Sequence, residues 1–270
     1  MSDEIRIEDL ELFANHGVYP EETKLGQKFL VSMCLRLSTR RAGLSDDLEA
    51  SIDYGAVCAF VAAHLREHTF KLIEAAAEHC AMAVLDNWPM LESLSFELKK
   101  PWAPVGLPLG CVSVKIERAR HRAYVALGSN LGDRRAYLDG AVKALASLEH
   151  CRLGPVSSFI ETKPFGGVEQ GDFLNGCLML ETLLEPEELL DELQKIEQAT
   201  HRERKIHWGP RTLDLDLLFY DDLIMNTERL TLPHPGIAER DFVLRPMAEI
   251  APGLVHPVFK KTMSRLLSEL

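Results

Sequence analysis

Hydrophobic and polar residues alternate with two different periods along the chain, and their order predicts the elements of a first α+β unit. A two-residue period indicates a strand with one buried face, whereas a spacing of three to four residues indicates a helix. The polar stretch 16–27 predicts a loop between the first two strands. The expected order is strand, strand, helix, helix, strand, strand over residues 5–13, 28–37, 54–68, 73–87, 91–100 and 111–118. This order predicts an antiparallel sheet with helices on one face.

A second unit opens directly after the first, because residues 119–121 are the whole connection to a new strand. We therefore place the domain boundary at 120, with domains 1–120 and 121–270. The expected order is strand, helix, strand, strand, helix, strand over residues 122–128, 134–148, 154–162, 173–183, 186–200 and 213–220. This β-α-β-β-α-β order is that of a ferredoxin-like fold, and a short C-terminal helix completes it.

Length and cysteine usage fit a two-domain intracellular protein. The chain has 270 residues, enough for two ordinary domains. The sequence has no apolar run long enough to span a bilayer and no N-terminal signal pattern. Its six cysteines are scattered without CxxC spacing, which predicts reduced thiols and no zinc site. We expect a cytoplasmic protein.

The charge distribution argues against binding to nucleic acid and favours a small anionic ligand. The formal net charge is −11, which is unfavourable for contact with a phosphate backbone. One local exception is the cation-rich stretch HRERKIHWGPR, residues 201–211, just before two aspartates. This juxtaposition predicts a site for a small polyanion such as a nucleoside triphosphate.

The stretch WGPRTLDLDLLF, residues 208–219, predicts a loop that leads into a strand with two carboxylates on one face. Leucine and aspartate alternate from Leu213 to Leu217, so Asp214 and Asp216 point to the same side, about 6.6 Å apart along the backbone. Adjacent carboxylates repel unless a cation lies between them, and Mg²⁺ prefers such oxygen ligands. The alternative is an exposed strand face that carries aspartates by chance, although aspartate is depleted in strands.

The second half resembles one enzyme family over residues 122–270. The motifs GSNLGD, ETKPFG, FLNG, HRER, WGPRTLDLDLL, PHP and RDFVLRP occur in the same order as in 6-hydroxymethyl-7,8-dihydropterin pyrophosphokinase. The resemblance implies a ferredoxin-like fold and transfer of a pyrophosphoryl group from ATP to the pterin hydroxymethyl group, which releases AMP. It also implies two Mg²⁺ ions.

This resemblance assigns roles to individual residues. Asp214 and Asp216 would hold both Mg²⁺ ions, and Arg202 and Arg211 would neutralise phosphate charge during the transfer. For Arg202 and Arg204, a solvated basic segment is the alternative. The nucleotide-binding residues implied are Arg204, Trp208, His234 and Arg240. The pterin-binding residues implied are Thr162, Pro164, Phe165, Phe173, Asn175 and Phe242.

Two alternatives stay open for residues of this half. Core packing is the alternative role for Phe173 and Phe242, although Asn175 shares the strand face of Phe173. Glu197 matches an acidic helix position of the family, and a solvated helix carboxylate explains it equally well.

The first half resembles dihydroneopterin aldolase over residues 1–118. The motifs are HGVYPEE, LGQ, SIDYG, KLIEAAAE and LKKP. The family forms rings of the tunnelling fold, an antiparallel sheet with two helices, with active sites between subunits. The resemblance implies that Glu74 and Ile73 bind the pterin and that Glu22 lines the site. Lys100 and Tyr54 would transfer protons without a cofactor, with Lys100 preferred to Lys99 because it precedes Pro101.

Together the two resemblances predict a bifunctional folate enzyme that cleaves 7,8-dihydroneopterin and then pyrophosphorylates the product. Its expected partners are pterins, ATP and copies of itself in a tetramer or octamer, with no nucleic acid and no membrane. One alternative keeps the pyrophosphokinase but makes the first half a catalytically silent assembly module. Another adds epimerase activity on the same pterin.

Overall fold

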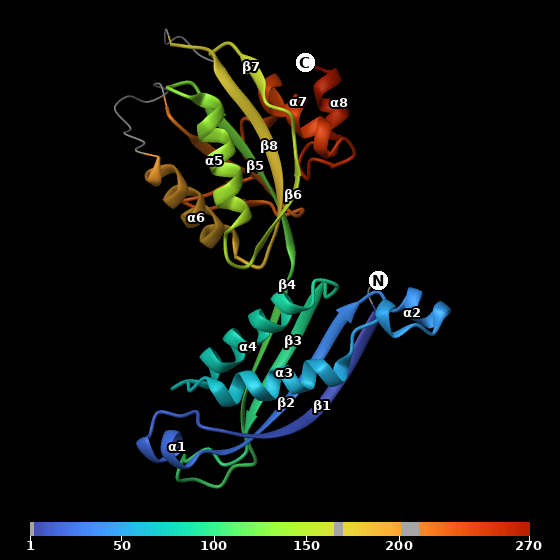
Figure 1. Cartoon of the computed structure of the whole chain (residues 1–270), viewed down its shortest axis with the longest axis vertical. Helices are drawn as coiled ribbons and strands as arrows, with labels where there is room; N and C mark the ends of the chain where they lie inside the picture. The colour runs from blue at the N-terminus through green and yellow to red at the C-terminus, as the bar shows by residue number, and fades with distance from the viewer. Residues whose placement is uncertain (1–2, 165–169, 201–210) are drawn as a thin grey trace. The chain divides into compact units, whose positions relative to one another are not determined.

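The chain folds as two compact units, Met1–Arg120 and His121–Leu270, and each is described by itself. A computed structural model describes residues 3–164, 170–200 and 211–270 (Figure 1). None of the helices in these ranges is long and apolar enough to cross a membrane.

The first unit is built on a four-stranded antiparallel sheet in which neighbours in sequence are neighbours in space. Its strands are β1 (Asp3–Ala14), β2 (Gln27–Leu37), β3 (Ser93–Lys100) and β4 (Val112–Ala119). Every second side chain of β2 is buried, beginning with Gln27 and then Phe29, as the two-residue period predicts.

Two long helices, α3 (Tyr54–Glu67) and α4 (Ile73–Asn87), cover one face of this sheet. Asp53 caps α3 because its carboxylate accepts a hydrogen bond from the Ala56 amide, one of the amides that a helix start leaves unpaired. The small side chains on the buried face of α4 let it pack closely. They are Ala76, Ala77, Cys80 and Ala81.

The stretch 16–27, predicted as a loop, contains the short helix α1 (Pro20–Leu25). Proline at the first helical position and Glu21 and Glu22 in the first turn favour this start, and Gly26 ends the helix with φ of +71°. The prediction failed because the stretch is too short to show a helical period. A second short helix, α2 (Arg40–Ser45), and a 3₁₀ turn (Leu48–Ala50) were not predicted for the same reason.

The second unit has the strand order β6-β8-β5-β9, with all pairs antiparallel. The strands are β5 (His121–Ser129), β6 (Cys151–Val156), β7 (Ile160–Thr162), β8 (Phe173–Thr182) and β9 (Asp214–Tyr220). The helices α5 (Arg134–Ala146) and α6 (Pro186–Ala199) lie on one face. The predicted ferredoxin-like arrangement is therefore confirmed.

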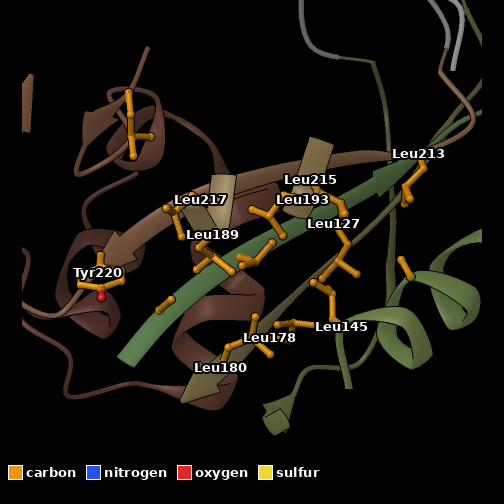
Figure 2. Close-up of a cluster of buried hydrophobic side chains, with 14 of the residues drawn as sticks. Leu127, Leu145, Leu178, Leu180, Leu189, Leu193, Leu213, Leu215, Leu217 and Tyr220 are labelled. Atoms are coloured by element: carbon orange, nitrogen blue, oxygen red, sulfur yellow. The ribbon is translucent and has the colours of Figure 1, made fainter. Parts of the chain in front are cut away.

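The core between this sheet and its two helices consists largely of leucine (Figure 2). Leu213, Leu215 and Leu217 all enter it, as their alternation predicts. Leu218 lies in a separate cluster on the opposite face, as the alternation predicts, but Phe219 joins the same cluster because the pairing of β5 and β9 shifts by one residue. Tyr220 returns to the first core.

The single strand predicted over 154–162 is two strands. The chain leaves β6 after Val156 and resumes pairing with β8 at Ile160. The buried Ser157 hydroxyl accepts a hydrogen bond from the Cys177 amide and so replaces one bond of the strand ladder. Local sequence gives no sign of this break, because it depends on the partner strand.

The opposite face of the sheet carries α7 (Asp241–Ile250) and α8 (Met263–Ser268), where one short helix was predicted. Their apolar residues pack against Cys177, Leu218 and Phe219. The 3₁₀ turn Ile237–Glu239 precedes α7.

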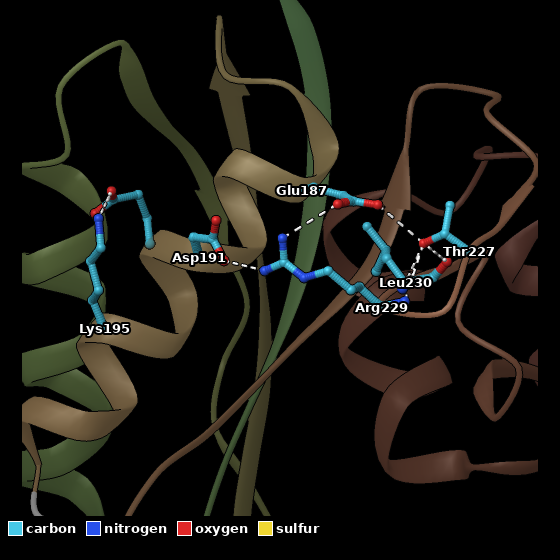
Figure 3. A network of polar contacts seen from close by, with 7 residues as sticks. Glu187, Asp191, Lys195, Thr227, Arg229 and Leu230 are labelled. Carbon is cyan, nitrogen blue, oxygen red and sulfur yellow. Dashed lines mark hydrogen bonds and ion pairs between the residues drawn. The ribbon is translucent and has the colours of Figure 1, made fainter.

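A small hairpin, β10 (Met225–Asn226) and β11 (Thr231–Leu232), follows the sheet and is tied to α6 (Figure 3). Arg229 pairs with Glu187 at 3.4 Å and with Asp191, and the Thr227 hydroxyl donates to Glu187 at 3.1 Å. These groups are partly exposed, so solvent screens the attraction within each pair.

Candidate active sites

The aspartate site of the second unit is formed where β9 begins, on the sheet face that carries α7 and α8. We use this name for Asp214 and Asp216 with Arg211, His234 and Arg240 around them. Asp214 pairs with Gly128 of β5, and Asp216 with Ala126. The two carboxylates therefore lie on one face, because both have the same parity along the strand.

Gly128 joins this site to β8, since it pairs with Asn175 on its other side. A Cβ atom on Gly128 would lie 3.0 Å from Asn175 Oδ1, 3.9 Å from Asp214 Cβ and 4.0 Å from a ring carbon of Phe173. The absence of a side chain at Gly128 thus leaves space between the predicted pterin-binding residues and Asp214. The motif GSNLGD by itself does not indicate this role of Gly128, because the effect of the missing side chain depends on both neighbouring strands.

Asn175 is buried and donates a hydrogen bond from its amide to the Thr162 hydroxyl, at 2.7 Å. Two of the predicted pterin-binding residues are therefore in direct contact, although 13 residues separate them. Pro164 lies two residues beyond Thr162, and Phe165 lies outside the described residues.

Cationic side chains surround the aspartates. Arg211 forms an ion pair with Asp214. Burial and the neighbouring Asp214 carboxylate raise the pKa of Asp216, whereas the charges of His234, Arg211 and Arg240 oppose this rise. Burial lowers the pKa of His234, against the attraction of Asp216. The arginines suit an anionic ligand, and the two carboxylates suit a cation bound together with it.

The donor set fits Mg²⁺ bound partly through a ligand. Carboxylate oxygens are hard donors, and two of them alternate on a rigid strand. Among the described residues, no group of three or more Asp, Glu, His or Cys side chains could hold a metal ion. Mg²⁺ commonly adds oxygens of phosphate groups and water to one or two carboxylates, and Asp214 and Asp216 fit such a site.

The Glu197 side chain is buried, so it is not a solvated helix carboxylate. Its side chain is buried on α6, and Oε1 accepts a hydrogen bond from the Leu215 amide at 2.8 Å. Strand β9 is at the edge of the sheet. The Glu197 carboxylate therefore satisfies the Leu215 N–H, which lies between Asp214 and Asp216 and has no neighbouring strand on that side.

The remaining predicted residues of this half lie near α7 or outside the described residues. The Arg240 guanidinium is 5.9 Å from the centre of the Phe242 ring, and Phe242 packs partly against the α7–α8 cluster. His234 donates its backbone N–H to Leu218 and accepts from Gly236 at Nδ1, which fixes the ring. Arg202, Arg204 and Trp208 lie outside the described residues.

The lysine site of the first unit is a buried ion pair with two further buried neighbours. We use this name for Lys100, Glu22, Gln27 and His16. Lys100 Nζ lies 2.5 Å from Glu22 Oε1, and Gln27 Nε2 donates to the same oxygen at 3.0 Å. Burial alone would raise the pKa of Glu22, but the hydrogen bonds from Lys100, Tyr19 and Gln27 hold it below its usual value.

The two adjacent lysines point to opposite faces of β3. Lys99 pairs with Asp9 at 2.7 Å on the outer side of the sheet, whereas Lys100 is buried beside Glu22. The alternation of the strand therefore places only Lys100 in the lysine site.

The sequence did not indicate that His16 and Gln27 belong to the lysine site. His16 is fully buried between Phe29 and Phe70, and its Nδ1 accepts a hydrogen bond from the Phe70 amide at 3.3 Å. Burial, followed by the charge of Lys100, lowers its pKa to about 4, so this histidine is neutral at pH 7. Within HGVYPEE the histidine looks like a loop residue, and only its contacts reveal its burial.

Tyr54, Ile73 and Glu74 lie at the starts of α3 and α4, as predicted, but Tyr54 and Glu74 are not bonded to the ion pair within the first unit. The Tyr54 side chain is 62% exposed, and Glu74 is exposed in the first turn of α4. In residues 3–120 no hydrogen bond or ion pair joins Tyr54 or Glu74 to Lys100 or Glu22.

Two family profiles match the two units. The profile of dihydroneopterin aldolase matches residues 5–117, and that of 7,8-dihydro-6-hydroxymethylpterin-pyrophosphokinase matches residues 124–252. The "Folic acid synthesis protein fol1" of Pneumocystis carinii is 33% identical over 96% of this chain and 37% of its own length. The chain spans little more than a third of the length of the first curated relatives it matches.

Shorter relatives correspond to single units. The 2-amino-4-hydroxy-6-hydroxymethyldihydropteridine pyrophosphokinase of Haemophilus influenzae is 45% identical over 55% of this chain and 89% of its own length. A crystal structure of Escherichia coli dihydroneopterin aldolase in complex with neopterin is 29% identical, covers 43% of this chain and 99% of that chain, and has a TM-score of 0.41.

Proposed function

Because the chain belongs to the 7,8-dihydro-6-hydroxymethylpterin-pyrophosphokinase family and carries a dihydroneopterin aldolase domain before it, we propose that it catalyses two consecutive steps of folate biosynthesis. The first unit, as the aldolase domain, cleaves 7,8-dihydroneopterin to glycolaldehyde and 6-hydroxymethyl-7,8-dihydropterin. The second transfers a pyrophosphoryl group from ATP to that product and releases AMP. The second assignment is supported by the position of Asp214 beside Gly128, with Asn175 and Phe173 on the other side of that glycine.

In the second unit, Asp214 and Asp216 would hold two Mg²⁺ ions that neutralise phosphate charge and orient the attacking hydroxyl. Arg211, Arg202, Arg204 and Arg240 bind the phosphates, because a guanidinium stays charged and matches phosphate oxygens in geometry. His234 and Trp208 contact the nucleotide. The task of the protein is positioning, since phosphoryl transfer depends mostly on alignment and electrostatics.

The pterin would bind on the sheet face beside the aspartates. Phe173 and Phe242 stack on the ring, and Asn175 reads its edge, held by Thr162. Pro164 and Phe165 complete the pocket. This places the hydroxymethyl group toward Asp214 and Asp216, where the ATP phosphates are bound.

In the first unit, cleavage breaks the bond between the first and second carbons of the pterin side chain. The second hydroxyl loses a proton as the aldehyde forms, and the first carbon gains a proton to become the hydroxymethyl group. Lys100 and Tyr54 move these protons, Glu22 orients the side chain through its pair with Lys100, and Glu74 and Ile73 bind the ring. This reaction uses no cofactor.

The exposed Tyr54 and the buried Lys100–Glu22 pair support a site completed by a second copy of the chain. We propose a homo-oligomer, a tetramer or an octamer, assembled through the first unit. The cytoplasmic location expected from the sequence stays a prediction.

The test is one incubation of the full chain with 7,8-dihydroneopterin, ATP and Mg²⁺, followed by chromatography of the products. We expect glycolaldehyde and AMP to form together. AMP that forms only when 6-hydroxymethyl-7,8-dihydropterin is supplied would contradict the aldolase assignment and favour a silent assembly module. ADP in place of AMP would contradict the pyrophosphokinase assignment.

A further inference from the structure

Asn130 follows the end of β5 and forms two hydrogen bonds to the backbone of Arg211. Its own amide N–H donates to the Arg211 carbonyl at 3.1 Å, and its side-chain Oδ1 accepts from the Arg211 amide at 2.8 Å. The side chain is buried, with 7% of the residue exposed. These bonds fix Arg211 across 81 residues of sequence, and the Arg211 guanidinium in turn pairs with Asp214.

The same side chain also holds a second segment. Its amide nitrogen donates to Gln170 Oε1 at 3.0 Å and to the Gly171 carbonyl at 3.4 Å. This segment leads directly into Phe173, the first residue of β8. Arg134 of α5 supports it independently, because its guanidinium donates to the Asp172 carbonyl at 2.7 Å.

We propose that Asn130 is a positioning residue for pyrophosphoryl transfer, which sets the phosphate-binding Arg211 and the pterin-binding Phe173 in one fixed geometry. This inference rests on the proposed function of the second unit. The amide suits the task because it offers an acceptor to one segment and donors to the other. Alignment of two bound substrates is sensitive, since misplacement by about 1 Å can lower a rate by 10²-fold.

The Asn130 side chain therefore connects the segment that binds the phosphates with the segment that binds the pterin. Arg211 belongs to the phosphate side of the aspartate site, and Phe173 lies beside Gly128 on the pterin side. Loss of the side-chain amide would remove its bonds to both segments and leave only the backbone bond from Asn130 to Arg211, while the core between the sheet and its two helices is unchanged.

The test compares Asn130→Ala with Ser157→Ala in the full chain. Ser157 is equally buried in the second unit, and its hydroxyl accepts from the Cys177 amide and donates to the Ser158 carbonyl, both at 2.9 Å. Ser157→Ala therefore controls for the loss of buried hydrogen bonds, because Ser157 is bonded to Cys177 and Ser158 and not to Arg211. The readouts are kcat and KM for AMP formation, glycolaldehyde release as an internal reference, and the unfolding midpoint in urea.

We expect Asn130→Ala to lower kcat/KM for AMP formation about tenfold or more, whereas Ser157→Ala stays within about threefold of the unmodified chain. Both variants should unfold at similar urea concentrations and release glycolaldehyde at the unmodified rate. An Asn130→Ala enzyme no slower than the Ser157→Ala enzyme would overturn the inference.

A second variant separates the two connections. Asn130→Asp keeps an acceptor for the Arg211 amide but loses the donor to the Gly171 carbonyl. We expect the KM for the pterin to rise about fivefold or more, while the KM for ATP stays within about threefold. Equal changes in both constants would overturn the two-sided role. Absence of AMP from the unmodified chain would instead overturn the proposed function, and this inference with it.

Discussion

Single buried polar residues in both units have specific partners, and these partners indicate what each residue does. Glu22 is buried against Lys100, Glu197 against the Leu215 amide, and Asn130 against two backbone segments. Burial of a polar group without such bonds would cost about 1–3 kcal/mol. Each of these residues therefore connects segments that must keep their relative positions for the proposed chemistry.

The first prediction at this scale concerns Asp216. We expect Asp216→Ala to lower AMP formation by about 10²-fold or more, because it removes an electrostatic partner of the transferring group. Glycolaldehyde release should be unchanged, since Asp216 lies in the other unit. Asp222→Ala, at an exposed position two residues beyond β9, is the matched control and should retain both activities. Loss of both activities in the Asp216 variant would show that the units are not independent.

The second prediction concerns His16 and pH. The pKa of His16 is about 4 when folded, below the usual histidine value of 6.5, so the unfolded chain binds the proton more tightly. The stabilisation from the neutral buried ring is therefore complete above pH 6.5 and is lost as pH falls toward 4. The total loss is about 3 kcal/mol of unfolding free energy.

Hydrogen–deuterium exchange of the β2 peptide between pH 4 and 7 measures this loss within the first unit, after correction for intrinsic exchange. His16→Leu should show a smaller decrease of protection toward low pH than the unmodified chain. His79→Gln, at an exposed position of α4, should follow the unmodified curve. Identical pH dependence in the His16 variant would contradict the assignment.

At the scale of elements, regular segments with one buried face followed their sequence pattern, and short or interrupted ones did not. β2 and the two long helices α3 and α4 were predicted nearly to the residue. α1 and the break between β6 and β7 were not, because a single helical turn has no period and a strand break depends on its partner.

The prediction at this scale concerns the buried face of α6. Leu193 is fully buried in the leucine core, so Leu193→Ala should lower the unfolding free energy of the second unit by about 2–5 kcal/mol. Gln194→Ala changes the exposed side of the same helix and should alter it by less than about 0.5 kcal/mol. Hydrogen–deuterium exchange of the β9 peptide over a urea series gives the unfolding midpoint of each variant; equal midpoints would mean that α6 does not pack as described.

At the scale of the whole molecule, the proposed product of the first unit is the proposed substrate of the second. Both units carry a candidate pterin site, and each site is built from residues of its own unit. If the proposed assignments are right, each reaction uses residues of its own unit, and the proposed oligomer supplies the second copy of the first unit.

The prediction at this scale is a mixing experiment. Lys100→Ala should lose glycolaldehyde release, because Glu22 loses its cationic partner, and should still form AMP from supplied 6-hydroxymethyl-7,8-dihydropterin. An equal mixture of Lys100→Ala and Asp216→Ala chains should convert 7,8-dihydroneopterin and ATP to AMP, with each variant alone as the control. A mixture as inactive as either variant would mean that the intermediate does not pass between chains through solution.

The sequence by itself determined the architecture of both units and the alternation of Asp214 and Asp216 with the leucines. These features are local, because a two-residue or helical period follows from the geometry of one element and the need to bury one face of it. The motifs further predicted both families, which the comparisons confirmed.

Only the tertiary structure decided which residues meet. Gly128 acquires its role because β8 and β9 flank it, Asn130 because Gln170 and Arg211 lie on its two sides, and His16 because Phe70 closes over it. The physical reason is the same in each case. Hydrogen bonds and close packing act over a few ångströms in space, and between these partners the chain runs through 40 to 86 residues whose spacing carries no information about the contact.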